Sequence, residues 1–184
     1  LAEPVDRHRL DRRRRARGHA LRRRLLAHRP GPVGEGARHH APADGGADHF
    51  RQCILAVRAR TGATIEVLTP DFEADTSAID TVLSARPEVF NHNLETVARL
   101  QQHVRRKSQY AVSLAVLRHA KKSGLVRTKS GLMLGLGETV EETIETMADL
   151  RGIGCDFLTM GQYLQPTTRH LPVVRYLHPT EFDQ

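Results

Sequence analysis

The sequence predicts an α/β protein in which four parallel strands alternate with helices. From residue 44 onward, short runs rich in β-branched and apolar residues are separated by segments whose apolar residues recur at three- and four-residue spacing. This alternation is typical of parallel β/α units. Polar clusters fall at or just after the predicted strand ends, where folds of this class bind ligands. A barrel-like sheet and an open doubly wound sheet both fit the pattern.

The first half of this region contains two helices and two strands. Phe50, Ile54 and Val57 lie at helical spacing and give the first helix an apolar stripe. The β-branched run that follows is typical of a strand, and Pro70 ends it. The expected elements are a helix over 47–60, a strand over 63–69, a helix over 76–85 and a strand over 89–93.

The second half continues the alternation. Thr139 and Glu142 form the sequence pattern of a capping box, which predicts where the last helix begins. The residues of that helix expected to face the core are Val140, Ile144, Met147 and Leu150. The expected elements are helices over 94–104 and 110–123, a strand over 128–136, a helix over 139–151 and a strand over 157–164.

The positive charge of the chain belongs to its first segment. Residues 1–43 contain 12 Arg, no Lys and four acidic residues, whereas residues 44–184 contain 16 Lys and Arg against 17 acidic residues. The net charge of +7 is therefore no argument that the α/β region binds nucleic acid.

Two interpretations of residues 1–43 stay open. Only nine residue types occur there, and all nine have codons that begin with G or C, as expected if a GC-rich gene is translated out of frame. The alternative is a genuine basic arm, in which the arginines contact phosphates or lie on a short amphipathic helix through Leu21, Leu25 and Leu26. Because Pro and Gly cluster over 30–36, either interpretation predicts a disordered segment.

The cysteine count excludes a disulfide framework and a cysteine metal site. Cys53 and Cys155 are the two cysteines, and we expect both to be small buried residues. No apolar run approaches the roughly 20 residues of a membrane span. No apolar segment near the first residue suggests a secretory signal, so we expect a cytoplasmic protein without a membrane partner.

Two polar clusters at strand ends are candidate ligand sites. Asn91 and Asn93 alternate along a strand and point to the same face, where their amides suit a polar ligand such as a ribose or an aminocarboxylate. Gly135 and Gly137 allow a ligand to approach the backbone, and Glu138 can accept hydrogen bonds at a helix start. The simpler interpretations are local turn capping and an ordinary glycine turn.

Three motifs carry a resemblance to a known family. Residues 89–96 (VFNHNLET), 129–139 (KSGLMLGLGET) and 161–167 (GQYLQPT), with 170–173 (HLPV) after them, resemble lipoyl synthases, which belong to the radical S-adenosylmethionine enzymes. The motifs occur in family order, and the resemblance covers residues 44–184, the C-terminal half of such an enzyme.

The resemblance implies a partial parallel β/α barrel in which this chain keeps strands three to six of six. It also implies an enzyme that inserts two sulfur atoms into an octanoyl chain on the lysine of a lipoyl carrier domain, its partner. The implied cofactors are S-adenosylmethionine and two 4Fe–4S clusters. The implied cofactor-binding residues are Asn91, Asn93, Gly135, Gly137 and Glu138. The residues expected to contact the substrate or carrier are Gln162, Tyr163, His170 and Arg175.

The cysteines that this chemistry requires are missing. Radical cleavage needs a cluster held by three cysteines spaced Cys-x3-Cys-x2-Cys, and the family's second cluster needs three more. The two cysteines here are 102 positions apart, so we expect no metal ligands and an inactive fragment. One alternative is a nucleic-acid-binding protein that uses the arginine arm, although residues 1–43 offer no aromatic residue for base stacking, so nucleic acid is not the expected partner. The other is a binding module that keeps affinity for S-adenosylmethionine.

Overall fold

The sheet contains four parallel strands in chain order. A computed structural model describes residues 43–183, which belong to a compact unit spanning Ala41–Gln184. The strands pair side by side in the order β1-β2-β3-β4, each parallel to the next. They are β1 (Glu66–Leu68), β2 (Val89–Asn91), β3 (Arg127–Leu134) and β4 (Phe157–Gln162). The predicted α/β class with parallel strands is confirmed, and the strands are shorter than predicted.

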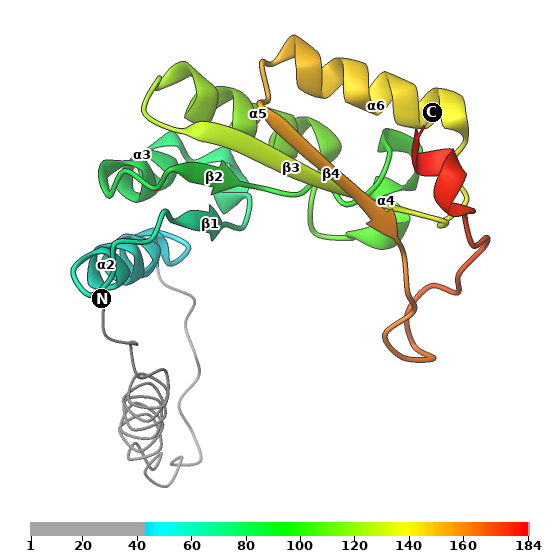
Figure 1. Cartoon of the computed structure of the whole chain (residues 1–184), viewed down its shortest axis with the longest axis horizontal. Helices are drawn as coiled ribbons and strands as arrows, with labels where there is room; N and C mark the ends of the chain where they lie inside the picture. Colours follow the sequence, from blue (N-terminus) through cyan, green and yellow to red (C-terminus); the bar gives the residue numbers. More distant parts are fainter. Residues whose placement is uncertain (1–42, 184) are drawn as a thin grey trace, which may run out of the picture. The chain divides into compact units, whose positions relative to one another are not determined.

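The connecting segments place helices along one face of this sheet. Figure 1 shows α3, α5 and α6 on the same side of the strands. The α-helices are α2 (Ala47–Arg58), α3 (Thr76–Ser84), α4 (Gln101–Val104), α5 (Tyr110–Lys122) and α6 (Val140–Gly152). Short 3₁₀ turns are η1 (Phe72–Ala74), η2 (Ala98–Leu100) and η3 (Pro179–Asp183).

The two faces of the sheet differ in character because strand side chains alternate between them. Val67 and Phe90 point toward the helices and are buried, at 8% and 0% exposed. Glu66 and Phe157 point to the opposite face and are exposed, and Lys129 on the same face is half-buried. In a barrel-type fold this second face is the interior, and ligands bind at the carboxyl ends of its strands.

The helix predicted over 94–104 is wrong in its first part. Glu95 has a φ of 71° and forms an isolated parallel bridge with Leu132. Its amide donates to the carbonyl of Gly131 at 2.9 Å, and its carbonyl accepts from the Met133 amide at 2.8 Å. The chain therefore continues along β3 after β2 ends, and helical structure starts only at Ala98. Pairing with a neighbouring strand outweighs the local helical pattern.

The expected core face of α6 is also wrong, although the capping box at its start is confirmed. Leu150 is buried, but Val140, Ile144 and Met147 are 61%, 58% and 41% exposed. The reason is the position of α6 beside the edge strand β4, beyond which the described residues add no further strand to the sheet. In α2, likewise, Ile54 is buried and Val57 is 45% exposed.

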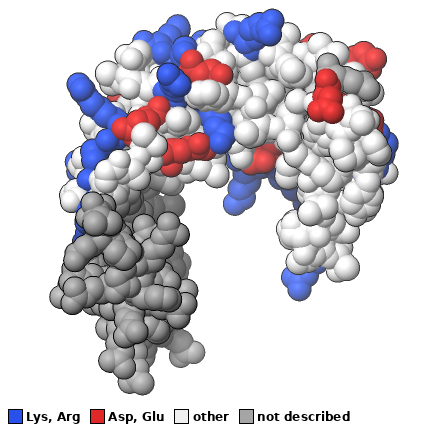
Figure 2. Space-filling view, in the orientation of Figure 1, with Lys and Arg blue, Asp and Glu red and all other residues white. Residues whose placement is uncertain are grey.

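Several remaining expectations concern cysteines, membranes and charge. Cys155 is partly buried, but Cys53 is exposed, so its expected burial is wrong. Within residues 43–183, no helix has the length and hydropathy to cross a membrane. On the face in Figure 2, Lys and Arg are interspersed with Asp and Glu, without an extended basic surface among the described residues. The predictions for residues 1–42 lie outside the part of the chain that the structure describes.

Candidate functional site

Asn91 ends β2 within a polar triad on the interior face. Its Nδ2 donates to Glu66 Oε1 at 2.9 Å, and Lys129 Nζ donates to both oxygens of that carboxylate, at 2.9 and 3.1 Å. The hydrogen bond from Lys129 is the main reason that the pKa of Glu66 lies below its usual value. Because Nδ2 is occupied, Oδ1 of Asn91 faces the other way, and it is buried without a hydrogen-bond partner among the described residues.

Asn93 lies two residues further along the chain, and its side chain lies against Gly131 of β3. The backbone carbonyl of Asn93 accepts from Arg105 Nη1 at 2.9 Å, which holds the strand end in place. Its Oδ1 lies only 2.8 Å from where a Cβ on Gly131 would stand. The amide itself has no hydrogen-bond partner within residues 43–183. An amide with a fixed backbone and free polar atoms is suited to bind a ligand.

His92 lies between these two asparagines and points to the opposite face, where it is 1% exposed. Its Nδ1 lies 3.0 Å from the Thr69 carbonyl, and its Nε2 lies 3.0 Å from Ser113 Oγ. A carbonyl can only accept, so Nδ1 carries the proton and Nε2 accepts from the Ser113 hydroxyl. Burial lowers the pKa of His92 and keeps the ring neutral. This residue therefore ties the ends of β1 and β2 to α5.

The glycine turn after β3 is closed by its own glutamate. Glu138 accepts hydrogen bonds from the amides of Gly135 and Leu136 at 2.5 and 2.9 Å. Gly135 has a φ of 100°, and a Cβ there would collide with the Arg175 carbonyl and with Gln162 Nε2. Gly135 is thus approached by another part of the chain. The backbone carbonyl of Gly137 accepts from Arg99 Nη2 at 2.9 Å.

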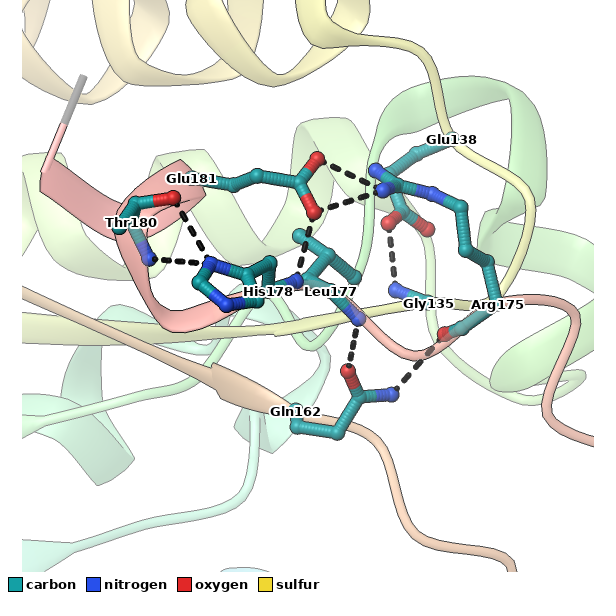
Figure 3. A network of polar contacts seen from close by, with 8 residues as sticks. All are labelled: Gly135, Glu138, Gln162, Arg175, Leu177, His178, Thr180 and Glu181. Atoms are coloured by element: carbon teal, nitrogen blue, oxygen red, sulfur yellow. Dashed lines mark hydrogen bonds and ion pairs between the residues drawn. The ribbon is translucent and has the colours of Figure 1, made fainter.

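That other part is the C-terminal strap, defined as residues 171–178. Figure 3 shows Gln162 reaching from the end of β4 to the strap backbone. Gln162 Nε2 donates to the Arg175 carbonyl at 3.2 Å, and Oε1 accepts from the Leu177 amide at 2.9 Å. Tyr163, 7% exposed, donates its hydroxyl to the Leu171 carbonyl at 2.9 Å. Both predicted substrate residues therefore hold the strap.

The remaining two predicted contact residues lie on or before the strap. Arg175 Nη1 pairs with both oxygens of Glu181, at 2.9 and 2.6 Å, and this contact is the main cause of the lowered pKa of Glu181. His170 is exposed, and its Nδ1 lies 2.8 Å from Thr167 Oγ1 in its own loop. The structure thus brings Gln162, Arg175 and the glycine turn together and leaves His170 outside that network (Figure 3).

The donor set does not fit an iron–sulfur cluster. Within the described residues, no group of three or more His, Cys, Asp or Glu side chains is close enough to hold a metal ion. The whole chain contains two cysteines, fewer than the three thiolates that such a cluster requires. The fit to S-adenosylmethionine is different, because the free amide of Asn93 and the unpartnered Oδ1 of Asn91 offer polar contacts at the carboxyl end of the sheet.

Sequence reasoning missed the residues that arrange the site. Glu66 and Lys129 are charged residues within predicted parallel strands, and they pair with each other. Because such strands are normally apolar, their charge was a signal in the sequence that could have indicated a site. Gly131 and Arg105 carried no such signal. Their contacts with Asn93 span 38 and 12 positions and depend on how the strands and the following loop pack.

Comparison with known proteins places the chain in the radical SAM superfamily. Residues 36–150 match the radical SAM superfamily. The lipoyl synthase of Rhodopirellula baltica is 57% identical over 143 residues, which are 77% of this chain and 45% of that protein. The lipoyl synthase of Caldicellulosiruptor saccharolyticus is 52% identical over 143 residues, covering 77% of this chain and 50% of that protein. The chain therefore spans about half the length of the curated relatives it matches.

A solved structure supports the fold. The crystal structure of methylornithine synthase superposes with a TM-score of 0.57 at 18% sequence identity, over 64% of this chain and 34% of that chain. At this identity the likeness concerns the fold alone. Together with the four parallel strands, it confirms the predicted partial β/α barrel.

Proposed function

Because this chain belongs to the radical SAM superfamily, we propose that it forms the S-adenosylmethionine-binding half of a lipoyl synthase barrel. Identities of 50–57% to lipoyl synthases support this assignment. In our proposal the octanoylated lipoyl carrier domain is the partner of the complete enzyme, which is cytoplasmic and inserts two sulfur atoms into the octanoyl chain. The candidate contacts of the cofactor are Asn91, Asn93, Gly135, Gly137 and Glu138.

One observation carries the proposal of ligand binding. The Asn93 amide is held at the carboxyl end of the sheet without a partner among the described residues, and its backbone is fixed by Arg105 at 2.9 Å. A half-buried amide without a partner at a strand end can form hydrogen bonds with a polar ligand. Asn91 supplies a second such atom, its buried Oδ1.

The same proposal holds that the chain alone performs no radical chemistry. Two cysteines cannot supply the three thiolates of one cluster, and the described residues contain no other group of metal ligands. Bound S-adenosylmethionine would supply radical chemistry only beside a reduced cluster, and two cysteines are too few to hold one. In this chain the asparagines and the glycine turn would bind and orient the cofactor without cleaving it.

Calorimetry with the full 184-residue chain tests the proposal. We expect saturable binding of S-adenosylmethionine and, after iron and sulfide reconstitution, no 5′-deoxyadenosine. Asn93→Ala should weaken binding about tenfold, the equivalent of 1.4 kcal/mol. Gln102→Ala, a substitution of an exposed amide on α4, should leave the affinity unchanged. Absence of binding by the unmodified chain would overturn the proposal.

The nucleic-acid alternative predicts a different outcome. It requires DNA retention that falls steeply with salt and disappears on deletion of residues 1–43. The mixed charges of the described residues in Figure 2 do not support this alternative. Salt-sensitive DNA retention, together with no binding of S-adenosylmethionine, would favour nucleic-acid binding by the arginine segment over the proposed function.

A further inference from the structure

Gly131 in β3 has no room for a side chain, whereas its backbone conformation does not require glycine. It is buried, and its φ lies outside the left-handed region that favours glycine. A Cβ at this position would stand 2.8 Å from Asn93 Oδ1, 3.1 Å from Asn93 Cγ and 3.3 Å from Thr159 Oγ1. Real Cβ atoms essentially never approach another heavy atom to 2.8 Å. The missing side chain therefore leaves a slot in β3, and the Asn93 amide occupies it.

The backbone around Asn93 cannot easily move out of this slot. The amide of His92 donates to the Lys129 carbonyl at 3.0 Å, and the amide of Glu95 donates to the Gly131 carbonyl at 2.9 Å. These two bonds attach the chain to β3 on both sides of Asn93. Arg105 holds the carbonyl of Asn93 itself at 2.9 Å. A side chain at residue 131 would therefore displace the Asn93 amide and not its backbone.

We propose that Gly131 is a positioning residue that orients the Asn93 amide as a hydrogen-bond donor to a ligand oxygen. Oδ1 and Cγ of Asn93 are its atoms nearest the slot, so Nδ2 is directed away from it. Asn91 is oriented in the opposite sense, because Glu66 occupies its Nδ2 and leaves Oδ1 as the acceptor. The strand end thus presents one donor and one acceptor, a pair that suits a hydroxyl-bearing ligand. This inference rests on the proposed function for its ligand.

A double-mutant cycle on stability tests the slot itself. Gly131→Ala, Asn93→Ala and the double variant are prepared in the full chain and unfolded with urea. We expect Gly131→Ala to lower the folding equilibrium constant measurably, because the Asn93 amide must shift, and to lower it less when Asn93 is already alanine. Gly161→Ala, on β4, is the matched control, because its Cβ would meet no atom within 4 Å. An equal effect of Gly131→Ala in both backgrounds would refute the slot.

Affinity for S-adenosylmethionine, measured by calorimetry on the same variants, tests the ligand role. We expect Gly131→Ala to weaken binding about tenfold, as Asn93→Ala does, without a further loss in the double variant. Asn93→Asp, which removes the N–H donors at nearly constant size, should lose as much as Asn93→Ala. Gly62→Ala, in an exposed loop with open space around it, should bind normally. Unchanged affinity of Gly131→Ala would overturn the positioning role.

The two experiments separate this inference from the proposed function. If the unmodified chain binds no S-adenosylmethionine but the stability cycle shows coupling, the proposed function and the ligand role fail and the slot stands. If the cofactor binds and the cycle shows no coupling, the proposed function stands and Gly131 has no role through Asn93.

Discussion

The helices at the two edges of the sheet, α3 beside β1 and β2 and α6 beside β4, bury their apolar residues to very different extents. On the β1–β2 side, α3 packs Ile79, Val82 and Leu83 at 1% exposure or less against a core that includes Phe90. On the β4 side, α6 exposes Val140, Ile144 and Met147. The same helical spacing of apolar residues thus gives a buried stripe in α3 and an exposed stripe in α6.

The open face of α6 has a definite shape. Two adjoining cavities of about 380 and 330 Å³ lie along it, and Ile144 and Met147 line both. The second cavity also includes Leu177 of the strap and Phe182 of η3. On this side, hydrogen bonds from Gln162 and Tyr163 hold the strap, whereas apolar burial dominates on the other. The difference teaches that a helical period identifies an apolar stripe but not what covers it.

The largest effect should come from a matched pair of isoleucines. Ile79→Ala, at a fully buried position in α3, should reduce the free energy of unfolding by about 2–5 kcal/mol, because it leaves a cavity. Ile144→Ala, at 58% exposure in α6, should change it by less than about 1 kcal/mol. Urea unfolding of the full chain measures both. Equal losses would show that α6 is covered in solution and would remove the contrast.

Loss of the Gln162 contacts should release the strap without opening the core. Gln162→Ala leaves the Leu177 amide without its acceptor and removes the Gln162 donor from the Arg175 carbonyl. We expect amide hydrogen exchange of Val174 and Leu177 to rise about tenfold, equivalent to about 1.4 kcal/mol. Gln165→Ala removes an exposed bond to the His170 carbonyl and serves as the control. Unchanged exchange over 174–177 would mean that Gln162 does not hold the strap.

The start of α6 depends on its cap more than on its exposed apolar side chains. Thr139 Oγ1 accepts from the Glu142 amide at 3.2 Å, and Glu142 Oε2 accepts from the Thr139 amide at 2.9 Å. Thr139→Ala should reduce the free energy of unfolding by about 1 kcal/mol, through loss of this reciprocal pair. Thr143→Ala, which removes a hydroxyl hydrogen bond to the Thr139 carbonyl, is the control. Denaturant unfolding of both variants separates the loss of the cap from general effects on the helix. A larger loss in the second variant would contradict the prediction.

The smallest effect near neutral pH should come from His92. Burial lowers its pKa in the folded chain, so the unfolded chain takes up the proton first as the pH falls below about 6.5. Stability is therefore complete above that pH and is lost as the pH falls toward the folded-state pKa. This group should contribute a loss of at most about 0.7 kcal/mol between pH 7 and pH 6. NMR titration of the ring checks it, and a folded-state pKa at or above 6.5 would contradict it.

Much of the fold could be predicted because its signals are local. The alternation of strand and helix patterns, the parallel class and the capping box of Thr139 and Glu142 depend on residues within a few positions of one another. The placement of Asn91, Asn93 and the glycine turn at strand ends followed from the same signals. Residues 94–97 were predicted wrongly because a partner far along the chain, β3, outweighs the local helical pattern there.

The sequence by itself determined the class of fold, the polar residues at the strand ends and the lack of cluster cysteines. Only the tertiary structure decided that Gly131 lies beneath Asn93, that Glu66 orients Asn91, and that Gln162 holds the strap. The physical reason is that periodicity specifies which way a side chain points along its own element. The neighbour it meets depends on strand pairing and loop packing, which join residues 13 to 38 positions apart.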